Sequence, residues 1–96
     1  MLGDRIMSSH KSIIVVFNSK NHSFHLEKLL KASGYSPIQY FAPSYLAKGC
    51  NSALKVSIDA LDFIILKKKS NNIDIYRIYT TKHLDGNRVY QVLKEF

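Results

Sequence analysis

Residues 12–34 read SIIVVFNSKNHSFHLEKLLKASG, and this stretch decides the fold. Its first part, SIIVVFN at residues 12–18, is a nearly continuous run of β-branched and aromatic residues. Such a run is typical of a central strand that is buried on both faces. In the second part, Leu26, Leu29 and Leu30 fall at helical spacing. The stretch therefore predicts a buried strand followed at once by a helix that packs through one apolar side.

Both ends of this helix carry residues that suit them. Ser19 or Asn21 can accept a hydrogen bond from the free backbone N–H groups of the first turn. Gly34 can adopt the left-handed conformation in which many helices end. We therefore expect a complete strand–helix unit between residues 12 and 34.

The segments that follow extend the unit into an α+β domain. We expect strands at residues 35–41, 52–57 and 73–80, and a helix over residues 58–72 that Ser57 or Asp59 opens. Pro37 suggests that the second strand lies at a sheet edge or begins there. The resulting order, β-α-β-β-α-β, is that of a ferredoxin-like sandwich. Its two helices cover one face of the sheet, and the other face needs some other cover.

The tail, residues 80–96, offers one candidate for that cover. Val89, Val92, Leu93 and Phe96 lie at the spacing of a helical stripe, and we favour a C-terminal helix. The alternative is a hairpin turn at Asp85–Gly86 that leads into a fifth strand. The chain is then one domain, residues 1–96, with a core at 12–79 and a C-terminal extension at 80–96.

Composition indicates the class of protein and the cellular compartment to expect. The chain has 96 residues, of which 46% are hydrophobic and 22% charged, as in globular proteins. It shows no signal peptide and no apolar run of the length that spans a bilayer, and its single cysteine fits a reducing compartment. We therefore expect a cytoplasmic protein without a membrane partner. A domain this small would gain stability from forming a homodimer.

The net charge of +7 favours an acidic protein or a polyanion as a partner. The run Lys67–Lys69 is more typical of the last turn of a helix, where cations suit the helix dipole. The third expected strand, SALKVS, contains no aromatic residue and lacks the pattern of RNA-recognition modules. Nucleic-acid binding would therefore depend on charge alone.

Most familiar catalytic patterns are missing. The sequence contains no phosphate-binding loop, no dinucleotide-binding glycine motif and no nucleophile elbow. His22 and His25 are three residues apart, and with Cys50 or His83 they do not reproduce a known metal-ligand spacing. We expect neither a metal nor a cofactor, and the protein is more readily a carrier than a conventional enzyme.

Cys50 is the residue with the most chemical potential. It lies in the segment KGCNS at residues 48–52, where Lys48 and backbone N–H groups of a glycine-containing turn could stabilise a thiolate. The same residue could also be a small apolar side chain that fills a gap. The sequence alone leaves both alternatives open.

A resemblance to a known family favours the first alternative. The segments VVFNS (15–19), LEKLLKASGY (26–35), FAPSYLAKGC (41–50) and SALKV (52–56) resemble the selenium/sulfur carrier protein-like family of small bacterial proteins. The resemblance covers residues 12–79 and implies a βαββαβ domain that handles sulfur or selenium, with Cys50 at the position of the family cysteine. Asn51 stands where that family usually has glycine, and the tail lies outside the shared pattern.

These observations lead to one main hypothesis and one alternative. In the main hypothesis Cys50 is the carrier nucleophile that holds a persulfide-type sulfur, and Lys48, Gly49, Asn51 and Ser52 shape and polarise its loop. With no second cysteine in the chain, donor and acceptor must be other proteins or small thiols. The alternative is a non-catalytic ferredoxin-like binding module for a protein or a polyanion.

Overall fold

The structure is a computed structural model that describes residues 11–96. Its elements are, in chain order, β1 (Ser12–Phe17), α2 (Lys20–Ala32), β2 (Ile38–Phe41), the 3-10 turn η1 (Ser44–Leu46), β3 (Ser52–Ser57), the 3-10 turn η2 (Ile58–Ala60), α3 (Leu61–Asn71), β4 (Ile75–Leu84) and β5 (Asn87–Glu95). The strands form one five-stranded sheet in the order β2-β3-β1-β4-β5. Every neighbouring pair is antiparallel.

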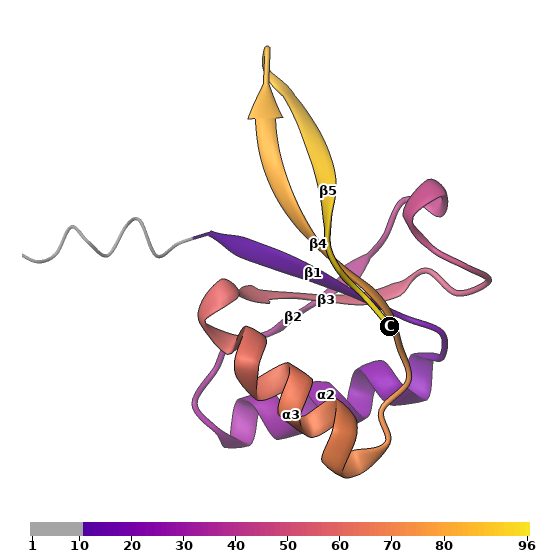
Figure 1. Ribbon diagram of the computed structural model, residues 1–96, viewed down its shortest axis with the longest axis vertical. Helices are drawn as coiled ribbons and strands as arrows, with labels where there is room; N and C mark the ends of the chain where they lie inside the picture. Colours follow the sequence, from indigo (N-terminus) through magenta and orange to yellow (C-terminus); the bar gives the residue numbers. More distant parts are fainter. Residues whose placement is uncertain (1–10) are drawn as a thin grey trace, which may run out of the picture.

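The α+β class predicted from the sequence is confirmed, and both helices lie on the same side of the sheet (Figure 1). The strand order is consistent with a ferredoxin-like arrangement in general, extended by one strand. Within residues 11–96, neither helix has the length and apolar character needed to cross a bilayer.

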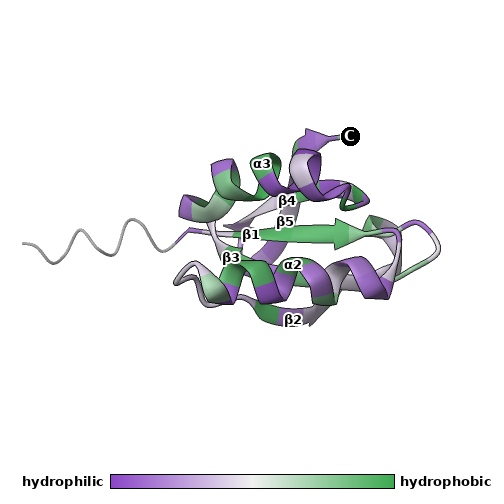
Figure 2. Ribbon diagram, turned by 90° about the horizontal axis from the view of Figure 1, so that it is seen from below, coloured by the Kyte–Doolittle hydropathy of each residue, from purple (hydrophilic) through white to green (hydrophobic). Residues whose placement is uncertain are grey.

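Strand β1 occupies the centre of the sheet and is buried on both faces. Its side chains from Ile13 to Phe17 are fully inaccessible to solvent. On the helix side, Ile13, Val15 and Phe17 belong to the main core, together with Leu26 and Leu30 of α2. Figure 2 shows β1 as hydrophobic along its length, running between the two helices. The sequence prediction for this strand is confirmed.

The opposite face of the sheet is covered by a second, smaller core. Ile14 and Val16 of β1 pack there with Ala42 and Leu46, which come from the loop between β2 and β3. Tyr79 of β4 joins this cluster, and its buried hydroxyl donates to the backbone oxygen of Leu46 over 3.0 Å. The loop therefore folds over the sheet and is fastened there by a buried hydrogen bond.

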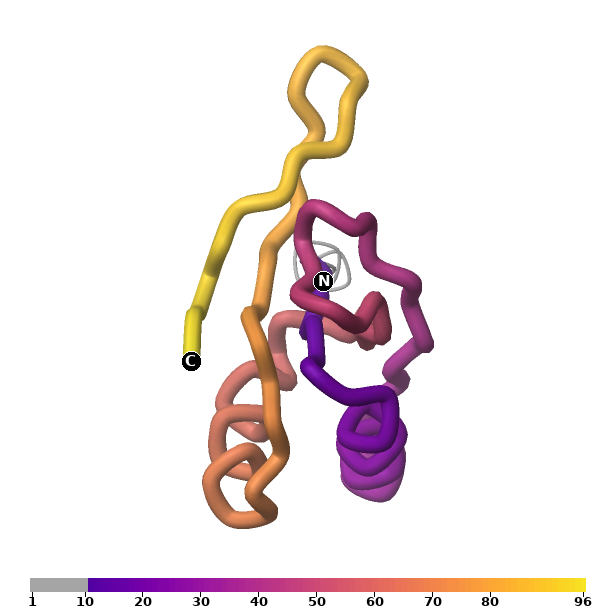
Figure 3. Tube along the Cα trace, turned by 90° about the vertical axis from the view of Figure 1, so that its right-hand side faces the viewer, coloured from indigo at the N-terminus to yellow at the C-terminus, as the bar shows by residue number. Residues whose placement is uncertain are grey.

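The expected C-terminal helix is wrong, because the tail forms strand β5 along β4. Asp85 and Gly86 both have positive φ, 53° and 80°, which is the backbone of the tight hairpin turn that matches strand twist. Once that turn forms, pairing with β4 supplies the backbone hydrogen bonds that a helix would otherwise make. The apolar stripe is not a buried helical face, since Val92, Leu93 and Phe96 remain 40–47% exposed. The far half of the hairpin projects beyond the rest of the chain (Figure 3).

Several local predictions can be compared with the structure. The third strand has the predicted bounds, and the second begins only after Pro37 and forms one edge of the sheet. Gly34 has a φ of 93°, as expected after the helix. Ser19 is at the N-cap position of α2, but its side chain makes no capping hydrogen bond. Ser57 does cap the second helical segment by accepting from the N–H of Asp59.

Replacing Tyr79 with phenylalanine should destabilise the fold by about 1–3 kcal/mol, because the backbone oxygen of Leu46 would lose its buried donor. Urea unfolding followed by circular dichroism measures this as a lower midpoint. Tyr45→Phe is the matched control, because Tyr45 is 75% exposed. Equal midpoints for the two variants would contradict the role given to the Tyr79 hydroxyl.

Candidate functional site

The loop that carries Cys50 is closed at its base by one residue. The side-chain amide of Asn51 donates to the backbone oxygen of Ala42 over 2.8 Å. The backbone N–H of Ala42 donates in return to the backbone oxygen of Asn51 over 2.9 Å. Since Leu46 is also buried against the sheet, the loop is fixed both at its base and at its middle. Cys50 lies directly beside this closed base.

The thiol of Cys50 is half-buried and lies among donors. Hydrogen bonding from the side chain and the backbone of Ser52 lowers the pKa of Cys50 below its ordinary value. Partial burial acts in the opposite direction, and the positive charge of Lys20 adds a smaller lowering effect. Donors that bind the charged form favour the thiolate, so the site increases the reactive fraction of the thiol.

Lys20 reaches this site because of strand register. In the antiparallel pair of β1 and β3, Val16 lies opposite Ala53, so the start of β3 lies beside the end of β1. Helix α2 begins at Lys20, shortly after β1 ends. Sequence reasoning missed this lysine because the two segments are 30 residues apart and only the register brings them together. The strand order expected from the sequence was the signal that could have found it.

The structure brings some of the predicted site residues together and leaves others apart. Ser52 lowers the pKa of the thiol by hydrogen bonding, and Asn51 closes the loop. Gly49 has a φ of 80°, which side-chain-bearing residues rarely adopt, so glycine suits this turn. Lys48, which was expected to polarise the thiol, is exposed in the same loop; Lys20, which is also exposed, has a positive charge that lowers the pKa of Cys50.

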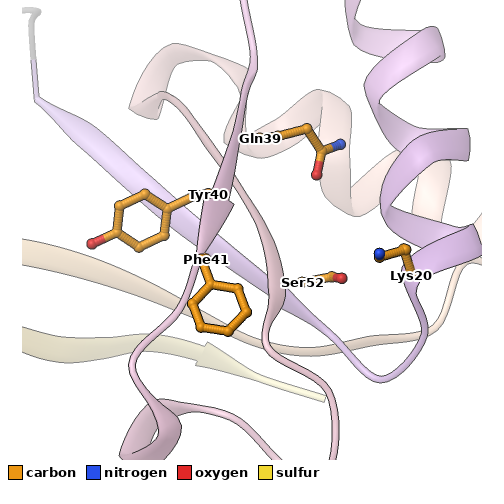
Figure 4. A pocket seen from close by; sticks show the side chains of 5 residues that line it. All are labelled: Lys20, Gln39, Tyr40, Phe41 and Ser52. Carbon is orange, nitrogen blue, oxygen red and sulfur yellow. The ribbon is translucent and has the colours of Figure 1, made fainter.

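A hollow of about 240 Å³ opens next to the cysteine loop. Its lining comes from three elements, α2, β2 and β3, through Lys20, Gln39, Tyr40, Phe41 and Ser52. Figure 4 shows the side chains of Lys20 and Ser52 directed toward one another, with the Phe41 ring at one side and Tyr40 pointing away. Ser52 and Lys20 are thus shared between the hollow and the surroundings of the Cys50 thiol.

One of the histidines considered as a metal ligand makes a structural hydrogen bond instead. The Nδ1 atom of His22 accepts from the backbone N–H of Asp74 over 2.6 Å, which joins the start of α2 to the segment before β4. The side chain of Asn18 donates to the carboxylate of the same aspartate over 2.9 Å. In the part of the chain that the structure describes, no three or more histidine, cysteine, aspartate or glutamate side chains are grouped as metal ligands.

Comparison with known proteins places most of the chain in one family. The sequence model of the family described as "Putative Se/S carrier protein-like" matches residues 12–80. The match includes the whole loop that carries Cys50 and ends within β4. No curated protein and no solved structure matches the chain with significance.

The lowered pKa of Cys50 should appear in the pH dependence of its alkylation. Because the thiolate is the reacting form, the rate with iodoacetamide should rise with pH to a midpoint below about 8.5, the usual thiol value. Ser52→Ala removes the hydroxyl donor and should move the midpoint upward, whereas Ser44→Ala, an exposed residue of η1, should leave it unchanged. A wild-type midpoint at or above about 8.5 would contradict this description.

Proposed function

The chain belongs to the Putative Se/S carrier protein-like family, and we propose that it carries a persulfide-type sulfur, or its selenium equivalent, on Cys50. The observation that carries the proposal is the family match, which includes the loop of Cys50; the lowering of the pKa of Cys50 by Ser52 supports it. A half-buried thiol with a lowered pKa beside an open hollow suits sulfur exchange better than simple space filling. The reaction belongs in a reducing compartment such as the cytoplasm, where a lone cysteine stays free.

Loading would proceed by attack of the Cys50 thiolate on the outer sulfur of a donor persulfide, R–S–SH. A bond forms between Sγ and that outer sulfur, and the S–S bond of the donor breaks. The bonding electron pair leaves with the donor as its thiolate, and the proton stays on the transferred sulfur. The products are Cys50–S–SH and R–S⁻, with no net oxidation or reduction. A selenium atom in the outer position would follow the same balance.

Delivery breaks the S–S bond that loading formed on Cys50. An acceptor thiolate attacks the outer sulfur, and Cys50 departs as a thiolate. Leaving groups of lower pKa depart faster, so the two Ser52 donors that stabilise the thiolate also favour release. A carrier must both accept and release its load, and stabilisation of the thiolate supports each step.

The remaining loop residues have supporting roles in this proposal. Asn51 fixes the loop base through Ala42, and Gly49 permits the left-handed turn that precedes the cysteine. Cys50 has no second cysteine beside it in the sequence to resolve the persulfide. Donor and acceptor are therefore separate molecules, either proteins or small thiols.

Persulfide loading can be measured directly by intact mass after incubation with a cysteine desulfurase and its substrate. The wild type should gain about 32 Da with sulfur, or about 79 Da with selenium, by formation of a persulfide or its selenium analogue. Cys50→Ser should gain nothing. The double variant Cys50→Ser/Ser70→Cys carries one exposed thiol at a distant helix end and should load far more slowly than the wild type. Equal loading of the relocated thiol would refute a dedicated site at Cys50.

A second candidate function, polyanion binding, rests on a separate observation. The ammonium groups of Lys68 and Lys94 lie 4.9 and 5.9 Å from the centre of the Phe96 ring, which is 46% exposed. Two cations from different elements thus surround one accessible ring. Single-stranded nucleic acids are bound by such combinations of phosphate-binding cations and stacking aromatics.

If this surface binds single strands, Lys68→Gln/Lys94→Gln should weaken the complex with an oligothymidine probe. The slope of log affinity against log salt should become shallower by about 1.4, since each phosphate contact contributes about 0.7. The control, Lys28→Gln/Lys82→Gln, removes the same charge from exposed positions elsewhere. Identical slopes in the two double variants would exclude Phe96 and its lysines as the binding surface.

A further inference from the structure

The hollow beside Cys50 has a distinct chemical character. Of its five lining side chains, Lys20 bears a full charge, Gln39 and Ser52 offer polar groups, and Phe41 offers an apolar ring. Within residues 11–96, no carboxylate forms an ion pair with Lys20. The hollow therefore presents one cation, hydrogen-bonding groups and one apolar wall to whatever enters it.

The carboxylate that contacts Gln39, a lining residue of the hollow, is already bound. Glu27 forms an ion pair with Lys31 over 3.0 Å and accepts from the Gln39 amide over 2.7 Å. The Gln39 hydrogen bond and then Lys31 lower the pKa of Glu27, so this carboxylate stays charged and bound to its own partners. The Lys20 ammonium thus remains free to bind an anionic group that enters from solvent.

The apolar wall is unusually accessible. Phe41 is 81% exposed at the sheet edge, although a phenylalanine ring gains free energy when it is covered. A ligand that lies against this ring while its anionic end meets Lys20 would use both features at once. A ligand of this kind has an anionic group on a short aliphatic body.

The size of the hollow indicates how large a group can lie inside it. Its volume of about 240 Å³ is below the range of about 300–1,000 Å³ that is usual for drug-sized ligands. This space is sufficient for a molecule of amino-acid size.

From these features we propose that the hollow binds the carboxylate of a small aliphatic thiol or persulfide, which is the exchange partner of Cys50. This inference rests on the proposed function, because it names the molecule with which the carrier exchanges sulfur. Lys20 would bind the carboxylate, the Gln39 amide would offer the hydrogen that does not bind Glu27, and Phe41 would cover the aliphatic part. Since Ser52 lines the hollow and also lowers the pKa of Cys50, a ligand in the hollow would lie beside the segment that carries the thiol.

Competing alkylating agents test the anion site without any sulfur transfer. Iodoacetate and iodoacetamide react with the same thiolate, so the ratio of their rates cancels the effect of pKa. Lys20→Met should lower the iodoacetate-to-iodoacetamide ratio about fivefold at low salt, from a charge interaction of about 1 kcal/mol. Lys20→Glu should lower it further, and Lys28→Met, on the exposed side of the same helix, should leave it unchanged. The same ratio in wild type and Lys20→Met overturns the proposal.

Protection then tests binding in the hollow itself. The thiol-free probe 3-(methylthio)propanoate should slow the alkylation of Cys50 by iodoacetamide, and its amide should not. Protection should be lost in Lys20→Met and weakened in Phe41→Ala, whereas Phe24→Ala, which removes another exposed ring, should retain it. Equal protection by the acid and the amide overturns the proposal. Neither assay depends on persulfide loading, so a failed loading experiment rejects the carrier function without deciding these results.

Discussion

The burial of β1 on both faces is the constraint on which the rest of the structure depends. A strand whose residues from Ile13 to Phe17 are all inaccessible needs cover on two sides, and the two helices supply only one. The second cover comes from the loop between β2 and β3, which lays Ala42 and Leu46 against Ile14 and Val16. Fixing that loop for the sake of the core also fixes the end of the loop that carries Cys50. The packing that stabilises the fold therefore also positions the candidate site.

The same arrangement balances two opposing effects on the thiol. Partial burial disfavours the thiolate, whereas the two donors of Ser52 and the charge of Lys20 favour it. A fully exposed cysteine would have neither the donors nor protection from unrelated thiols. A fully buried one could not meet a donor or an acceptor. A half-buried thiol avoids both extremes, and its position follows from a loop that is closed by Asn51 and anchored by Leu46.

The sequence was sufficient to predict those parts of the fold in which the local pattern and the tertiary contacts favour the same secondary structure. The β-branched run of β1, the leucines of α2 and the short strand β3 all appear where predicted. The tail was misread because Val89, Val92 and Phe96 satisfy helical spacing, although the Asp85–Gly86 turn favours a hairpin and pairing with β4 stabilises it. Lys20 and the hollow escaped prediction for another reason. They exist only when the register of β1 against β3 and the course of the β2–β3 loop are known.

The tail is connected to the site from the opposite face of the sheet. The hydroxyls of Tyr40 and Tyr90 lie 2.7 Å apart, and the ring of Tyr45 packs edge-on to that of Tyr90. Burial, followed by the Tyr40 hydrogen bond, raises the pKa of Tyr90, so its phenol stays protonated at neutral pH and can take part in this hydrogen bond as donor or acceptor. Tyr40 is flanked in β2 by Gln39 and Phe41, which line the hollow on the helix side. Strand β5 lies beyond the part of the chain that matches the family. Through Tyr90 it nevertheless contacts Tyr40 of β2, the edge strand whose other side chains line the hollow.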